Sequence, residues 1–130
     1  MHPLIGLVTL LTVLLLIALM ALVGRARGRY DVKAPATTGP DGFERTFRVQ
    51  MNTQESALMF LPALWVAAGF GQAWLAASFG AVWLVARAWY ALAYIDPAKS
   101  RALPFVLSFL AILALLVQGL WGIGWTLALR

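Results

Sequence analysis

The sequence lacks cysteine altogether and contains one histidine, His2. Without cysteine there can be no disulfide framework, no thiolate metal site and no cysteine nucleophile. His2 has no second ligand beside it, so the sequence predicts no bound metal. Charge is scarce as well: 12% of the residues are charged, with five acidic side chains against ten basic ones, while 62% are hydrophobic. This composition excludes the surface of an ordinary soluble domain.

Long uncharged stretches make up most of the chain. Residues 4–23 carry no charge, and about 20 such residues span the core of a bilayer. A cleaved signal peptide would have basic residues before a shorter apolar run, whereas here they follow it. We therefore predict an all-α transmembrane four-helix bundle, folded as a single domain over residues 1–130. Its spans are predicted at about residues 4–24, 45–70, 74–94 and 102–127, with a polar loop from Arg25 to about Gly42.

Basic residues are distributed unevenly between the two ends of this bundle. One end carries the loops 25–44 and 95–101, and the other end carries only Arg130. The basic residues at the loop end are Arg25, Arg27, Arg29, Lys33, Arg45, Arg48, Lys99 and Arg101. Because cytoplasmic loops are enriched in Lys and Arg, both loops are predicted to face the cytoplasm and both termini the opposite side. The basic residues flank spans and form no folded soluble surface, so no nucleic-acid partner is expected.

A polar stripe enters the second predicted span. Arg48, Asn52 and Glu55 are spaced i, i+4 and i+7, which places them on one face of a helix, and Arg45 lies one turn earlier. An ionisable group near the bilayer centre costs about 2.5 kcal/mol or more, so such a stripe indicates a ligand site.

The third predicted span carries a second polar face. Arg87, Tyr90 and Tyr94 fall at i, i+3 and i+7 near the same end of the bundle. Two structural roles are open: Arg87 can pair with Glu55, and the tyrosines can anchor the helix at the membrane interface. Taken together, the two faces bring cations, phenols, an amide and a carboxylate to one membrane level, which suits a small charged ligand.

These residues resemble a known family. The stretch that carries the likeness is FERTFRVQMNTQESALMFLPALWVA, with residues 36–40 before it and residues 86–94 and Arg101 after it. The sequence is similar to the membrane-associated proteins in eicosanoid and glutathione metabolism (MAPEG), in the branch of leukotriene-C synthases and microsomal glutathione transferases. The likeness covers about residues 20 to 120 and includes four spans of suitable length.

The resemblance implies a membrane-bound glutathione transferase that acts on lipophilic electrophiles and reduces lipid hydroperoxides with glutathione. It implies a homotrimer with its sites between subunits, open to membrane lipid, in which the tyrosines come from the neighbouring subunit. The implied glutathione ligands are Arg27, Arg48, Gln50, Asn52, Glu55, Tyr90 and Tyr94. Arg101 falls at the arginine that stabilises the thiolate. Ser56 stands where leukotriene-C synthases have a tyrosine, and Gly28 where they have a second arginine, which counts against an eicosanoid substrate.

The chemistry of these side chains agrees with a peptide-like thiol. Guanidinium groups bind carboxylates through paired hydrogen bonds, which suits Arg48 and Arg27, and Glu55 can bind an ammonium group. A free thiol has a pKa of about 8.5. Lowering it to about 6.5 requires roughly 2.7 kcal/mol of preferential anion stabilisation, which one partly desolvated guanidinium can supply. No protein base is then needed.

Three alternatives stay open at this stage. The family also contains a non-enzymatic scaffold that binds fatty acid and lacks the activating arginine, so Arg101 discriminates between the two functions. The polar residues could instead only fix the packing of helices in a structural membrane protein. Another small thiol could also take the place of glutathione.

Overall fold

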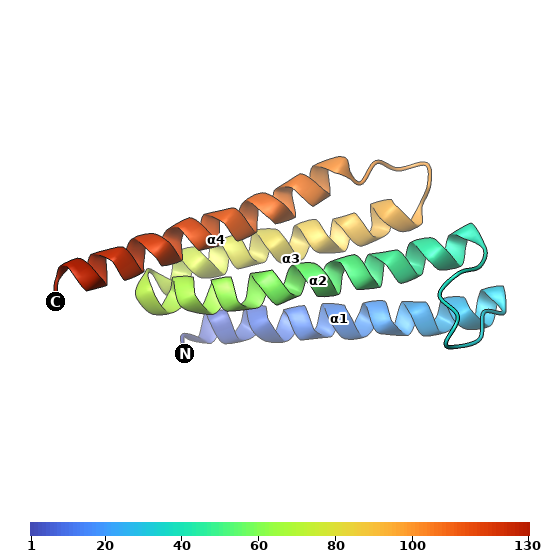
Figure 1. Cartoon of the computed structure of the whole chain (residues 1–130), viewed down its shortest axis with the longest axis horizontal. Helices are drawn as coiled ribbons and strands as arrows, with labels where there is room; N and C mark the ends of the chain where they lie inside the picture. Colours follow the sequence, from blue (N-terminus) through green and yellow to red (C-terminus); the bar gives the residue numbers. More distant parts are fainter.

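The computed structural model describes all 130 residues as four long helices (Figure 1). They are α1 (Pro3–Tyr30), α2 (Asp41–Phe70), α3 (Ala73–Ile95) and α4 (Ala102–Ala128). The imidazole Nδ1 of His2 accepts a hydrogen bond from the backbone N–H of Leu4 and so caps the start of α1. The prediction of an all-α four-helix fold is confirmed.

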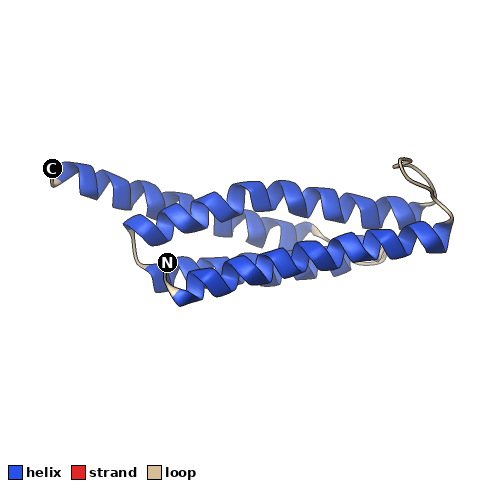
Figure 2. Ribbon diagram, turned by 90° about the horizontal axis from the view of Figure 1, so that it is seen from below, coloured by secondary structure: helices blue, strands red, loops and turns tan.

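The helices run alternately up and down, with α2 and α3 at the centre. Each of these two helices contacts all the others, whereas α1 and α4 do not touch. Both chain termini and the short α2–α3 turn lie at one end of the bundle, and the two longer connections lie at the other (Figures 1 and 2). We call these the terminal end and the loop end.

The core lies along the middle of the bundle and joins all four helices. Its centre is the stack of Phe60 on Trp83, whose ring centroids are 4.0 Å apart and whose planes differ by 5°. Small residues let the helices approach closely: a Cβ added at Gly122 would overlap the carbonyl oxygen of Phe70, and one added at Gly80 would lie 2.8 Å from Val8. The stack of Phe60 on Trp83 fixes α2 against α3, which positions the polar faces described below.

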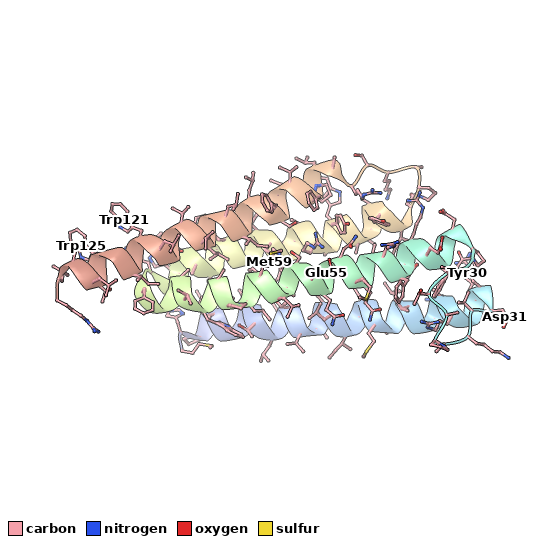
Figure 3. The ribbon with its side chains drawn as sticks, viewed as in Figure 1. Tyr30, Asp31, Glu55, Met59, Trp121 and Trp125 are labelled. Atoms are coloured by element: carbon pink, nitrogen blue, oxygen red, sulfur yellow. The ribbon has the colours of Figure 1, made fainter.

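Helices α1, α3 and α4 are each long and apolar enough to cross a membrane. Helix α2 is 30 residues long, but its first half carries the polar stripe, so its composition alone does not mark it as a span. Large apolar side chains are exposed along α1 and α4, and Trp121 and Trp125 project from α4 at the terminal end (Figure 3). An apolar outer surface of this kind is suited to lipid.

The predicted start of the first loop at Arg25 is wrong. Helix α1 continues to Tyr30, so Arg25, Arg27 and Arg29 belong to its last turns and the loop covers only residues 31–40. Basic groups in the last turn interact favourably with the helix dipole. The helix ends at Asp31, whose backbone is left-handed (φ 54°, ψ 48°) and whose N–H bonds to the carbonyl of Arg27.

Candidate functional site

A polar cleft of about 650 Å³ opens at the loop end between α2, α3 and α4. We call it the outer cleft. Because α2 and α3 are antiparallel neighbours, residues 45–52 lie beside residues 90–94, and the α3–α4 connection closes one side. The lining residues are Arg45, Asn52, Tyr90, Tyr94, Pro97, Lys99, Ser100, Arg101, Ala102 and Phe105. Four of the eight residues expected in the site, Asn52, Tyr90, Tyr94 and Arg101, therefore meet in one cleft.

Asn52 and Tyr90 are joined directly. The amide Nδ2 of Asn52 donates a hydrogen bond of 3.0 Å to the phenol oxygen of Tyr90. As a residue, Tyr90 is only 3% exposed. The ring of Tyr90 lies 5.6 Å from that of Tyr94. Tyr90 is therefore a buried residue that forms one wall of the cleft. The prediction that it anchors the helix at the membrane interface is wrong.

Arg101 lies at the start of α4 with its side chain exposed to the cleft. Its guanidinium carbon is 4.3 Å from the centre of the Tyr94 ring, a cation–π contact that holds the group over the cleft. Arg101 makes no ion pair, since Arg45–Asp41 is the only one in the chain. Its side chain also donates no hydrogen bond to the protein, so its donors are available to a bound anion.

Arg45 also lines the outer cleft, although it was not predicted to be a ligand from the sequence. Its Nε bonds to Asp41 at 2.8 Å and its Nη1 donates to the backbone carbonyl of Tyr94 at 3.1 Å. A smaller pocket of about 220 Å³ adjoins the outer cleft here and is lined by Asp41, Glu44, Arg45, Arg48, Tyr94 and Arg101. In the sequence, the i, i+4 spacing of Asp41 and Arg45 indicates an ion pair on one helix face, and this could have pointed to Arg45. Three guanidinium groups thus line one pocket together with Tyr94, an arrangement that suits a ligand with more than one carboxylate.

A second cavity of about 320 Å³ lies deeper along the bundle, and we call it the inner cavity. It shares Asn52, Tyr90 and Phe105 with the outer cleft. Its lining residues are Asn52, Glu55, Ser56, Met59, Arg87, Tyr90, Phe105, Ser108, Phe109 and Ile112. Glu55 and Met59 lie one turn apart about halfway along α2 (Figure 3). Glu55 is thus in this cavity and not in the outer cleft.

The expected pairing of Arg87 with Glu55 is wrong for the single chain. Arg87 is 2% exposed, lies 4.2 Å from the centre of the Tyr90 ring and donates a long hydrogen bond of 3.4 Å to Ser108 Oγ. Its Nε has no partner. The side chain of Glu55 is instead exposed on the surface of the chain.

Two expected ligands, Arg27 and Gln50, line none of these three pockets. Arg27 Nη1 donates to the carbonyls of Ala36, at 2.8 Å, and Val32, at 3.4 Å, and so holds the 31–40 loop against α1. Gln50 is about 200° around α2 from Arg48, because successive residues turn by about 100°. Within the single chain, Tyr90 and Tyr94 line the outer cleft together with Asn52.

The chain is similar to several known proteins. The model of the MAPEG family matches residues 5–121. The chain is 45% identical over 122 residues to the uncharacterized protein sll1147 of Synechocystis, covering 94% of this chain and 89% of that one. It is 38% identical to human microsomal glutathione S-transferase 2, covering 87% of this chain and 76% of the relative. It is 39% identical to leukotriene C4 synthase of Cavia porcellus, and the match covers 92% of this chain and 80% of the relative.

Proposed function

The chain belongs to the MAPEG family, and from that premise we propose that it is a membrane-bound glutathione transferase that joins the glutathione thiolate to lipophilic electrophiles. Relatives named as a glutathione S-transferase and a leukotriene C4 synthase support a reaction that uses glutathione. The observation that carries the proposal is the unpaired guanidinium of Arg101 over the outer cleft.

Glutathione has two carboxylates, an ammonium group, two peptide groups and a thiol. In the proposed site Arg45 and Arg48 bind carboxylates in the adjoining pocket, because planar guanidinium groups match carboxylates with two hydrogen bonds. Asn52 and the phenol of Tyr90 face the peptide groups, and the Tyr94 ring forms the floor. Glu55, one turn further along α2, takes the ammonium group.

Arg101 acts on the sulfur. The thiolate is the nucleophile, and a free thiol with a pKa of about 8.5 is mostly protonated at neutral pH. A guanidinium at hydrogen-bond distance stabilises the anion, and each pKa unit corresponds to about 1.36 kcal/mol. The thiolate sulfur attacks the electrophilic carbon, the leaving group departs with its electron pair, and a thioether forms. With a lipid hydroperoxide, two glutathione molecules give the disulfide, the lipid alcohol and water.

We propose a homotrimer with the sites between subunits. Arg48 and Glu55 are exposed on one chain although α2 lies within a membrane bundle, and a neighbour that covers them would remove this unfavourable exposure to lipid. Arg27 and Gln50 point away from their own cleft, so they can reach glutathione only if they approach the cleft of the neighbouring chain. In this proposed arrangement Tyr90 and Tyr94 come from the same chain as Asn52, and Arg27 and Gln50 come from the neighbouring chain.

Thiolate formation tests the function directly. Purified protein in detergent should give the ultraviolet absorbance of a bound thiolate when glutathione is added at neutral pH. Arg101→Ala should abolish this signal, while the matched variant Arg130→Ala, at the terminal end, should keep it. If glutathione binds to the wild-type protein without any thiolate signal, the transferase proposal fails and the non-enzymatic lipid-binding scaffold becomes the better function.

A further inference from the structure

A further cavity, of about 500 Å³, lies at the terminal end of the bundle, and we call it the terminal pocket. It is formed by the end of α2, the start of α3 and the last turns of α4, which extend beyond the α2–α3 turn (Figure 1). Gly122 allows α4 to approach this turn, because a Cβ there would overlap the carbonyl oxygen of Phe70. The terminal pocket shares no residue with the outer cleft or the inner cavity, so it is separate from the proposed transferase site.

The walls of the terminal pocket are mainly apolar and carry no charge. Phe70, Trp121 and Trp125 line it and are 49%, 73% and 62% exposed. None of the lining residues has an ionisable side chain. A charged ligand group would lose hydration there without gaining a counter-charge, so the pocket favours an uncharged ligand. Tryptophan is enriched where a protein meets the membrane–water interface, which places the pocket at the level of lipid headgroups.

One polar side chain of the terminal pocket lacks a hydrogen-bond partner. The amide Nε2 of Gln118 donates a hydrogen bond of 2.9 Å to the backbone carbonyl of Gln72. Because a carbonyl oxygen can only accept, the NH₂ group of Gln118 must face it, which leaves Oε1 as the free atom. Gln118 Oε1 is buried and accepts no hydrogen bond from the protein. A buried acceptor without a donor is unfavourable, and rotation of the amide about its bond to Gln72 presents Oε1 to a donor in the pocket.

We propose that the terminal pocket binds the headgroup of an uncharged glycerolipid with free hydroxyl groups, a monoacylglycerol, through a hydrogen bond from a hydroxyl to Gln118 Oε1. A hydroxyl group donates a hydrogen bond without carrying a charge, whereas ester and ether oxygens can only accept. The acyl chain of the lipid lies outside the pocket, along the large apolar side chains that are exposed on α4. This site does not depend on the transferase function, because it lies at the opposite end of the bundle from Arg101.

The test compares 1-monododecanoylglycerol with its dimethyl ether, in which methyl groups replace both hydroxyl hydrogens. Binding is measured by calorimetry in lauryldimethylamine oxide, a detergent that has no hydroxyl group. The ratio of the two Kd values is compared between proteins, because partition of the lipids into micelles is the same for each protein and cancels. Gln118→Met removes the acceptor and should lower the preference for the free diol by about threefold to tenfold. An unchanged ratio in Gln118→Met overturns the proposal.

The matched control for this variant is Gln54→Met, at an exposed position of α2 outside the terminal pocket, which should keep the wild-type ratio. Two tryptophan variants keep the test decisive if Gln118→Met does not fold. Trp125→Ala removes a wall of the pocket and should weaken binding of the diol. Trp74→Ala, at the same end and 59% exposed but outside the pocket, should not. Binding at wild-type strength to Trp125→Ala, or equal losses in the two tryptophan variants, overturns the proposal.

Discussion

The amide of Asn52 on α2 donates a hydrogen bond to the phenol oxygen of Tyr90 on α3, although the two residues are 38 positions apart. Tyr90 also contacts the guanidinium of Arg87 through its ring face and packs beside Tyr94. One polar contact therefore fixes the wall that the outer cleft and the inner cavity share. Both pockets depend on the register of α2 against α3.

This contact leads to a prediction about coupling. Tyr90→Phe removes one oxygen and keeps the ring over Arg87, and Asn52→Ala removes the donor. Each change should raise the Kd of glutathione by about threefold to tenfold, the range of one hydrogen bond. The double variant should lose less affinity than the sum of the two single losses, because both changes remove the same hydrogen bond. Calorimetric titration of all four proteins measures this, and strictly additive losses would contradict a shared contact.

Replacement of Arg101 should mainly lower kcat, whereas replacement of Arg45 should mainly raise the KM for glutathione. At pH 7, Arg101→Ala should lower kcat for conjugation of an aryl halide by about twentyfold, because a rise of the thiol pKa from about 6.5 to about 8.5 lowers the thiolate fraction from roughly three quarters to roughly 3%. The KM for glutathione should change little. Arg45→Ala, which removes a carboxylate-binding group and the contact to the carbonyl of Tyr94, should mainly raise that KM.

Arg29→Ala provides the matched control for these kinetics. Arg29 is exposed at the same end of the bundle and stacks on Tyr30, outside both pockets. Its replacement should leave kcat and KM at wild-type values. A large loss of kcat in Arg45→Ala but not in Arg101→Ala would exchange the two assignments.

The sequence predicted the helices well wherever a residue dictates the end. Gly71 and Gln72 form the α2–α3 turn, and α4 begins at Ala102 as expected. The end of α1 was missed because Gly24 and Gly28 do not interrupt the helix, and the Arg and Ala residues between them are good helix formers. A boundary between apolar and basic residues marks where a span ends, not where the helix ends.

The site was predicted as far as single-helix geometry allows. The spacing of Arg48, Asn52 and Glu55 predicted that they share one face of α2, and each of them lines one of the pockets described above. The same rule places Gln50 on the opposite face. Contacts between helices were beyond reach, since they depend on register: Asn52 meets Tyr90, and Arg87 lies away from Glu55. The role of Arg27 in holding the loop depends on where α1 ends, and that boundary was missed.

Removal of the central stack should destabilise the bundle. Phe60→Ala deletes a side chain that is 0% exposed and stacked on Trp83, and such a deletion costs about 3–5 kcal/mol. Thermal unfolding in detergent, followed by circular dichroism, should show a clear fall in midpoint. Leu58→Ala, two residues earlier and 72% exposed, should leave the midpoint almost unchanged. Equal effects of the two variants would contradict the packing described above.

The proposed orientation in the membrane can be tested without background, because the chain has no cysteine of its own. Lys33→Cys and Ala98→Cys introduce one thiol into each connection at the loop end, and Leu129→Cys introduces one at the terminal end. All three positions are exposed. The excess of basic residues at the loop end predicts that a membrane-impermeant maleimide labels Leu129→Cys in intact cells. The other two variants should be labelled only after lysis. Labelling of Lys33→Cys and Ala98→Cys in intact cells, with Leu129→Cys protected, would reverse the orientation and place the outer cleft outside the cytoplasm.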